Sequence, residues 1–267
     1  MSKLSNAIQT IYKIEKQSGR DTWLNRLHPL VKLLVTVFYI VLVVSFPKYN
    51  LAGLLGMSLY LLALFLIGEF SLSESIKRLK YILPVVCIMG ILNPLFDKKP
   101  VMEVCGVMVS GGVISMVTLI VKGIFTVLAA YLLILTTSVE KICFALRKLH
   151  MPQILVTVVL LIFRYVHVLL EEAEKVTQAY ALRAPKQRGI HFKAWGTLIG
   201  QLLLRSMDRA NDVYESMLLR GYGMRNVWQD TEDNMQFTDM VWLFVWAVLL
   251  VLLRKIPVFV WVGNLLV

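Results

Sequence analysis

Residues 30–68 read LVKLLVTVFYIVLVVSFPKYNLAGLLGMSLYLLALFLIG, and this stretch decides the fold class. It holds two apolar runs, 30–46 and 51–68, and each is close to the roughly 20 residues that a helix needs to cross a bilayer. The four residues between the runs, PKYN, are typical of a turn. The stretch therefore predicts two membrane-spanning helices that form an antiparallel pair.

Three further apolar runs, 82–96, 113–137 and 240–253, continue this pattern along the chain. Pro84 and Pro94 interrupt the first of them, which makes it the weakest of the five predicted spans. Hydrophobic residues make up 58% of the 267-residue chain, a share outside the usual range of soluble proteins. These observations predict an all-α membrane protein with about five transmembrane helices.

The basic residues predict the orientation of the spans, because positively charged loops stay in the cytoplasm. The first 29 residues are polar and basic without an apolar core, so we expect no cleavable signal peptide and a cytoplasmic N-terminus. The loop 71–80 is also basic, and four spans would return the chain to the cytoplasm near residue 138. Arg254 and Lys255, which follow the last span, weakly oppose this topology.

The net charge of +11 raises the question of nucleic-acid binding. The excess Lys and Arg, however, lies beside or between apolar runs, where orientation in a bilayer requires it. We therefore expect a lipid bilayer and no nucleic acid as a partner. Residues 139–238, in which Lys and Arg outnumber Asp and Glu, are predicted to form a cytoplasmic domain of long amphipathic helices.

One segment of this domain, residues 154–170, is long and apolar enough to span the membrane. It contains Arg164 and His167, and an Arg at the middle of a bilayer costs about 2.5–3.5 kcal/mol on insertion scales. An extra span would also place the basic region outside. We prefer a helix that lies against the cytoplasmic face, and the spanning alternative stays open.

Two polar helices are predicted to end in the same way. Apolar residues recur at three- and four-residue steps over 171–183 and over about 194–219, as in amphipathic helices. Pro185 stops the first helix, and Gly221 and Gly223 stop the second. Each helix therefore ends on a Leu-Arg-small triplet, and the two triplets are Leu182, Arg183, Ala184 and Leu219, Arg220, Gly221.

The arginines have two interpretations. A cation in the last turn of a helix interacts favourably with the helix dipole by roughly 0.3–1 kcal/mol, and such ends are common. A guanidinium at a helix tip can also enter a groove on a partner and bind a carboxylate through two hydrogen bonds. The repetition of the pattern in one cytoplasmic region favours the second interpretation.

Motifs for chemistry within the chain are missing. There is no phosphate-binding loop, the four histidines are not spaced for zinc, and no paired carboxylates lie in a span, so we expect no catalytic residue, metal site or cofactor. Cys87, Cys105 and Cys143 are expected to pack as small hydrophobic residues. Lys122 alone lies well inside a span, where it snorkels or pairs with a partner subunit.

Residues 151–222, with LRAPKQRGIHFKAWGTLIGQLLLRSMDRANDVYESMLLRGYG at their centre, resemble the transmembrane component of energy-coupling factor transporters, the CbiQ/EcfT family. The connector QRGIHFKAWG is most similar to the cobalt-type branch. The resemblance implies that the two triplets bind two ABC ATPase subunits. It also implies a separate substrate-binding S component in the membrane.

The resemblance implies a scaffold that couples the ATPases to the S component of an importer in a prokaryotic cell membrane, and cobalt, another transition metal or a vitamin as the substrate. We expect no enzymatic activity, since the partner ATPases hydrolyse ATP. The alternative is a membrane-bound enzyme of lipid or isoprenoid metabolism. The predicted domains are an N-terminal segment, spans 1–4, the coupling-helix domain and the C-terminal span with its tail, at residues 1–29, 30–138, 139–238 and 239–267.

Overall fold

The computed structural model describes most of the chain. The described residues are 23–68, 75, 84, 86–88, 90–91, 93–94, 100–104, 107–185, 189–223 and 235–255. Most of the N-terminal segment, much of the predicted third span, Cys105 and the C-terminal tail lie outside them. The described residues belong to two compact units, one within His150–Asn234 and the other within Glu15–Leu149 plus Met235–Val267.

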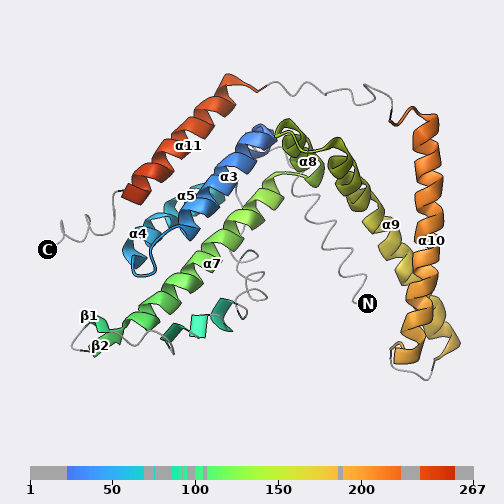
Figure 1. Ribbon diagram of the computed structural model, residues 1–267, viewed down its shortest axis with the longest axis horizontal. Helices are drawn as coiled ribbons and strands as arrows, with labels where there is room; N and C mark the ends of the chain where they lie inside the picture. Colours follow the sequence, from blue (N-terminus) through green and yellow to red (C-terminus); the bar gives the residue numbers. More distant parts are fainter. Residues whose placement is uncertain are drawn as a thin grey trace. The chain divides into compact units, whose positions relative to one another are not determined.

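The chain is predominantly helical, as predicted (Figure 1). One unit holds α9 (Gln153–Arg183) and α10 (Phe192–Leu219). A two-stranded antiparallel hairpin, β1 (Pro100–Val104) with β2 (Val107–Ser110), precedes α7 and was not predicted. The helices of the other unit are α2 (Trp23–Arg26), α3 (Pro29–Val44), α4 (Leu51–Gly56), α5 (Ser58–Gly68), α7 (Gly111–Thr136), α8 (Val139–Lys148) and α11 (Phe237–Lys255).

Four described helical segments are long and apolar enough to cross a membrane, and α3 is a shorter apolar helix. Three of the four match predicted spans: α4 with α5 matches 51–68, α7 matches 113–137 and α11 matches 240–253. The fourth is α9. The prediction of an all-α, multi-pass membrane protein is therefore confirmed, with the small hairpin as an addition.

Helix α3 lies at the centre of its unit, in contact with α7, α8 and α11 (Figure 1). Tyr39 and Val43 on α3 are completely buried. The Tyr39 hydroxyl donates to the carbonyl of Met57 at 3.2 Å, where α4 gives way to α5. The Tyr39 ring packs on Tyr60, which in turn packs edge-on against Trp246 of α11. Aromatic packing thus connects α3, α5 and the distant helix α11.

Two lysines join α3 and α7 by capping each other's helix. Lys32, near the start of α3, is 6% exposed and its Nζ donates to the carbonyl of Thr136, the last residue of α7, at 2.9 Å. Lys122 of α7 donates to the carbonyls of Val44 and Phe46, at the end of α3, at 2.9 and 2.6 Å. The last carbonyls of a helix have no partner within the helix, so each lysine satisfies groups that would otherwise be unpaired.

These contacts also fix the directions of the helices. Lys32 and Thr136 show that the start of α3 lies beside the end of α7. The start of α11 lies there too, because Asp239 Oδ1 accepts from the amide of His28 at 3.0 Å. At the other end, Arg254 Nη2 donates to Ser45 Oγ at 3.0 Å. Helices α3 and α11 therefore run parallel, and α7 runs antiparallel to both.

Helix α8 is a short amphipathic helix packed against the first turns of α3. Its Ala145 forms a buried cluster with Leu30 and Leu33. Lys148 Nζ lies 3.0 Å from Nε2 of His28, the residue that caps the start of α3. The end of α8 thus lies beside the starts of α3 and α11.

Cys143 of α8 is 2% exposed and forms no disulfide. Burial raises the pKa of its thiol, and the charge of Glu140 raises this pKa further. A thiol in such surroundings stays protonated and behaves as a small hydrophobic group. The prediction for Cys143 is therefore confirmed.

We expect Lys122→Met to lower the free energy of unfolding by about 2 kcal/mol, because hydrogen bonds from a charged group to two helix-end carbonyls are lost. Thermal unfolding of the purified chain in detergent, followed by tryptophan fluorescence, measures the change. Lys193→Met, an exposed lysine on α10, is the matched control and should leave the midpoint unchanged. Equal midpoints for both variants would refute the capping role.

Candidate docking site at the ends of α9 and α10

Helix α9 is one continuous helix of 31 residues. The sequence segments 154–170 and 171–183 therefore form a single rod, about 46 Å long at 1.5 Å per residue. The helix ends at Arg183, as predicted. The amide of Ala184 donates to the carbonyl of Tyr180 at 3.1 Å, and Pro185 follows at the point where a further helical turn is disfavoured.

Helix α10 starts beside the end of α9. His191 caps its N-terminus, because its Nδ1 accepts from the amide of Lys193 at 3.3 Å. The amide of His191 in turn donates to the hydroxyl of Tyr180 in the last turns of α9 at 3.4 Å. The cap and this bond hold the two helix ends together across the short connection, and neither was predicted.

The end of α10 forms a regular glycine cap. Gly221 has a φ of +85°, which glycine adopts without strain. Its amide donates to the carbonyl of Leu218 at 2.9 Å, and the amide of Tyr222 donates to the carbonyl of Met217 at 2.9 Å. This pair of bonds is the Schellman motif. Arg220 is the capping residue itself, whereas Arg183 is the last residue of its helix, so the two ends differ by one position.

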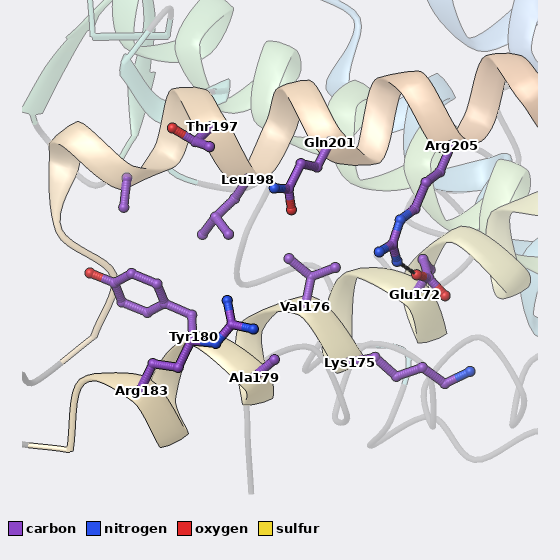
Figure 2. A pocket seen from close by; sticks show the side chains of 11 residues that line it. Glu172, Lys175, Val176, Ala179, Tyr180, Arg183, Thr197, Leu198, Gln201 and Arg205 are labelled. Carbon is purple, nitrogen blue, oxygen red and sulfur yellow. Dashed lines mark hydrogen bonds and ion pairs between the residues drawn. The ribbon is translucent and has the colours of Figure 1, made fainter.

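The two helices run antiparallel and meet at an ion pair between Glu172 and Arg205. A groove of about 550 Å³ lies on one side of this pair, and a second groove of about 530 Å³ lies on the other. Figure 2 shows the first groove, where Tyr180 and Arg183 of α9 lie with Leu198 of α10. The sequence pattern gave no indication of the Glu172–Arg205 contact, since 33 residues separate its partners.

The antiparallel arrangement places the two arginines at opposite ends of α10. Arg183 lines the first groove together with Ala194, in the first turn of α10. Arg220 follows the last residue of the same helix. With 28 residues at 1.5 Å each, α10 separates the two helix ends by about 40 Å.

Both guanidinium groups are free to bind another molecule. Arg183 and Arg220 are exposed, and neither side chain has a hydrogen-bond acceptor among the residues that the structure describes. The leucine before each arginine is also exposed, by 82% for Leu182 and by 90% for Leu219. Each end therefore offers a cation with several donors and an apolar side chain.

The described part of the chain contains no group of side chains suited to bind a metal ion. No three His, Cys, Asp or Glu side chains there lie close enough together to hold a metal ion. Lys122, which the sequence singled out within a span, is bonded to the end of α3. The helix ends of α9 and α10 thus stand out as the candidate site, and their chemistry suits docking of a partner surface.

We expect Gly221→Ala to weaken the cap of α10 by about 1 kcal/mol, because an alanine is strained at positive φ. Hydrogen exchange at the backbone amides of residues 221 and 222 should then become about fivefold faster. Ala184→Gly is the control, since Ala184 has a φ of −128° and needs no special residue. Unchanged exchange in the Gly221 variant would contradict this account of the cap.

Two curated proteins and one family model are similar to this chain. The uncharacterized protein MJ1089 of Methanocaldococcus jannaschii is 27% identical over 119 residues, which are 44% of this chain and 44% of that protein. The uncharacterized protein MJ1571 of the same organism is 25% identical over 148 residues, 54% of this chain and 51% of that protein. The chain thus spans about half the length of the curated relatives it matches. A family model described as CbiQ, cobalt transport protein, matches residues 20–229, well over half of the chain, so the chain belongs to the CbiQ family of cobalt transport proteins.

Proposed function

We propose that this chain is the coupling subunit of an energy-coupling factor importer. In this role it transmits the ATP-driven motion of two cytoplasmic ATPase subunits to a substrate-binding S component in the membrane. The observation that carries the proposal is the pair of exposed guanidinium groups at the ends of α9 and α10, which have no partner among the described residues. The description of the family supports cobalt as the substrate. The chain itself then carries no catalytic residue, and its partners hydrolyse ATP.

The separation of the helix ends supports two ATPase subunits. A groove that receives one helix end contacts only a few residues on each side of it, whereas the two ends are about 40 Å apart. One groove therefore cannot hold both Arg183 and Arg220. Two subunits, or two equivalent grooves of an ATPase dimer, meet this requirement.

The chemistry of each contact follows from the guanidinium group. Its planar fork binds a carboxylate through two parallel hydrogen bonds, or several backbone carbonyls at a groove wall. Removing one partner of such a buried contact costs about 2–5 kcal/mol. In the proposed role, Leu182, Arg183 and Ala184 form one contact, and Leu219, Arg220 and Gly221 form the other.

The number of membrane crossings supports a proposed topology. The end of α8 and the start of α11 lie at the same end of their unit, because both contact His28. The chain between them must cross the membrane an even number of times or not at all. Only α9 is a candidate span in the described part of this interval, and the remaining stretches 186–188 and 224–234 are too short to cross.

We therefore place α9 and α10 on the side of the membrane where α3 begins. The excess of Lys and Arg in this region assigns that side to the cytoplasm, where ATPases reside. The apolar first half of α9, with Ile154 70% and Ile162 63% exposed, then faces lipid or the S component. The proposed domains are 1–29, 30–138, 139–238 and 239–267, and α8, the first helix of the third, packs on α3 in the other unit. We propose that the protein is located in the cell membrane of a prokaryote.

We expect the double variant Arg183→Ala plus Arg220→Ala to insert normally but to bind the ATPase at least about 100-fold more weakly, since two charged contacts are lost. The measurement is co-purification of the ABC ATPase of the source organism with the tagged, co-expressed chain. Arg209→Ala, an exposed arginine in the middle of α10, is the control. Undiminished recovery of the ATPase by the double variant would refute the proposed coupling role.

The topology can be tested by cysteine labelling in a background without Cys87, Cys105 and Cys143. A cysteine in place of Asp212, exposed on α10, should react with a membrane-impermeant maleimide only after cells are permeabilised. A cysteine in place of Tyr49, between α3 and α4, should react in intact cells. Labelling of the α10 position in intact cells would show that this region is external, beyond the reach of an ATPase.

A further inference from the structure

We propose that Leu182 and Leu219 are specificity-determining residues, each of which fills an apolar pocket beside the acceptor that binds the neighbouring arginine. The inference rests on the proposed function and adds the chemistry of the partner's groove. Each groove would combine carboxylate or carbonyl oxygens with a cavity that holds a leucine side chain. An ATPase with a purely polar groove would then be a poor partner.

The exposure of these leucines singles them out. Among the described residues, only a few large apolar side chains are at least 80% exposed, namely Leu66, Leu182, Phe192, Leu219 and Phe237. Leu66 and Phe237 belong to helices of the unit that contains α3, α7 and α11, the membrane unit, where lipid covers apolar surface. The other three all lie at the ends of α9 and α10. Leu182 and Leu219 are therefore, together with Phe192, the most exposed large apolar side chains of α9 and α10.

The local geometry favours a groove over a flat partner surface. Neighbouring residues on a helix point about 100° apart, so Leu182 and Arg183 project from different flanks of the last turn of α9. A flat surface would contact one of these flanks. A groove that encloses the helix end contacts both, and it buries the leucine while it binds the guanidinium.

The second end repeats this arrangement. Leu219 closes α10 and Arg220 caps it, and the Schellman bonds of Gly221 and Tyr222 hold this last turn in a fixed conformation. A side chain presented by a fixed turn loses little conformational freedom on binding. The burial of Leu219 would therefore add to affinity, and a groove without an apolar pocket would be rejected.

The experiment measures binding of detergent-purified chain to the ABC ATPase of the source organism by a titration. We expect Leu182→Ala and Leu219→Ala each to raise the dissociation constant about 50-fold, because three carbons of buried apolar surface are lost. Leu182→Met and Leu219→Met, which keep the apolar volume, should bind as the parent chain does. Alanine suits a helix well, so these variants should fold normally.

The matched control is Leu203→Ala with Leu204→Ala, two leucines of α10 that are 58% and 64% exposed but lie far from either end. Parent-like binding by the control, with loss at Leu182 and Leu219, supports the inference. Parent-like binding by the Leu182 and Leu219 variants, while the double arginine variant fails to bind, overturns the inference and leaves the proposed function standing. If the double arginine variant also binds as the parent chain does, both the inference and the proposed function are overturned.

Discussion

A helix that ends within or near a bilayer must have its last carbonyl groups satisfied, and this constraint accounts for the arrangement of the membrane unit. Helix α3 has only 16 residues, about 24 Å, and is shorter than the hydrocarbon core. The amides of Ser45 and Phe46 donate to the carbonyls of Val41 and Val43, and Lys122 of α7 supplies the donor for the carbonyl of Val44, the last residue of the helix. Lys32 serves the end of α7 in return. The two bonds fix the antiparallel register of α3 and α7, on which α8 and α11 then pack.

The unit formed by α9 and α10 is sparsely packed, in contrast to the membrane unit. No residue of α10 is buried, and the helix meets α9 mainly around one ion pair with open grooves on both sides. Exposed ion pairs contribute little to stability, about 0–1 kcal/mol. Two long helices with so little shared surface are suited to being held by other molecules. The proposed contacts with ATPases at the helix ends, and with lipid or an S component along α9, would supply the missing partners.

The proposed function requires both the packed membrane unit and the sparsely packed pair α9 and α10. A coupling subunit needs both parts. The long helices transmit the motion of the ATPases, and the membrane unit must resist that motion. In the proposed function, the arginines act at the ends of long rods, where an applied force acts over about 40 Å. Membership in the CbiQ family is consistent with such a role in transport.

The sequence by itself determined the fold class, most of the spans and the ends of α9 and α10. These properties depend on local patterns: apolar length, helical periodicity, a proline at 185 and a glycine at 221, which act on the backbone within a few residues. Only the tertiary structure decided what Lys122 binds, that the amide of His191 donates to Tyr180, and that Glu172 meets Arg205. It also decided that the two arginines lie at opposite ends of one helix and that their leucines are exposed. Such facts depend on contacts between residues distant in the chain, and neither periodicity nor composition specifies which surfaces meet.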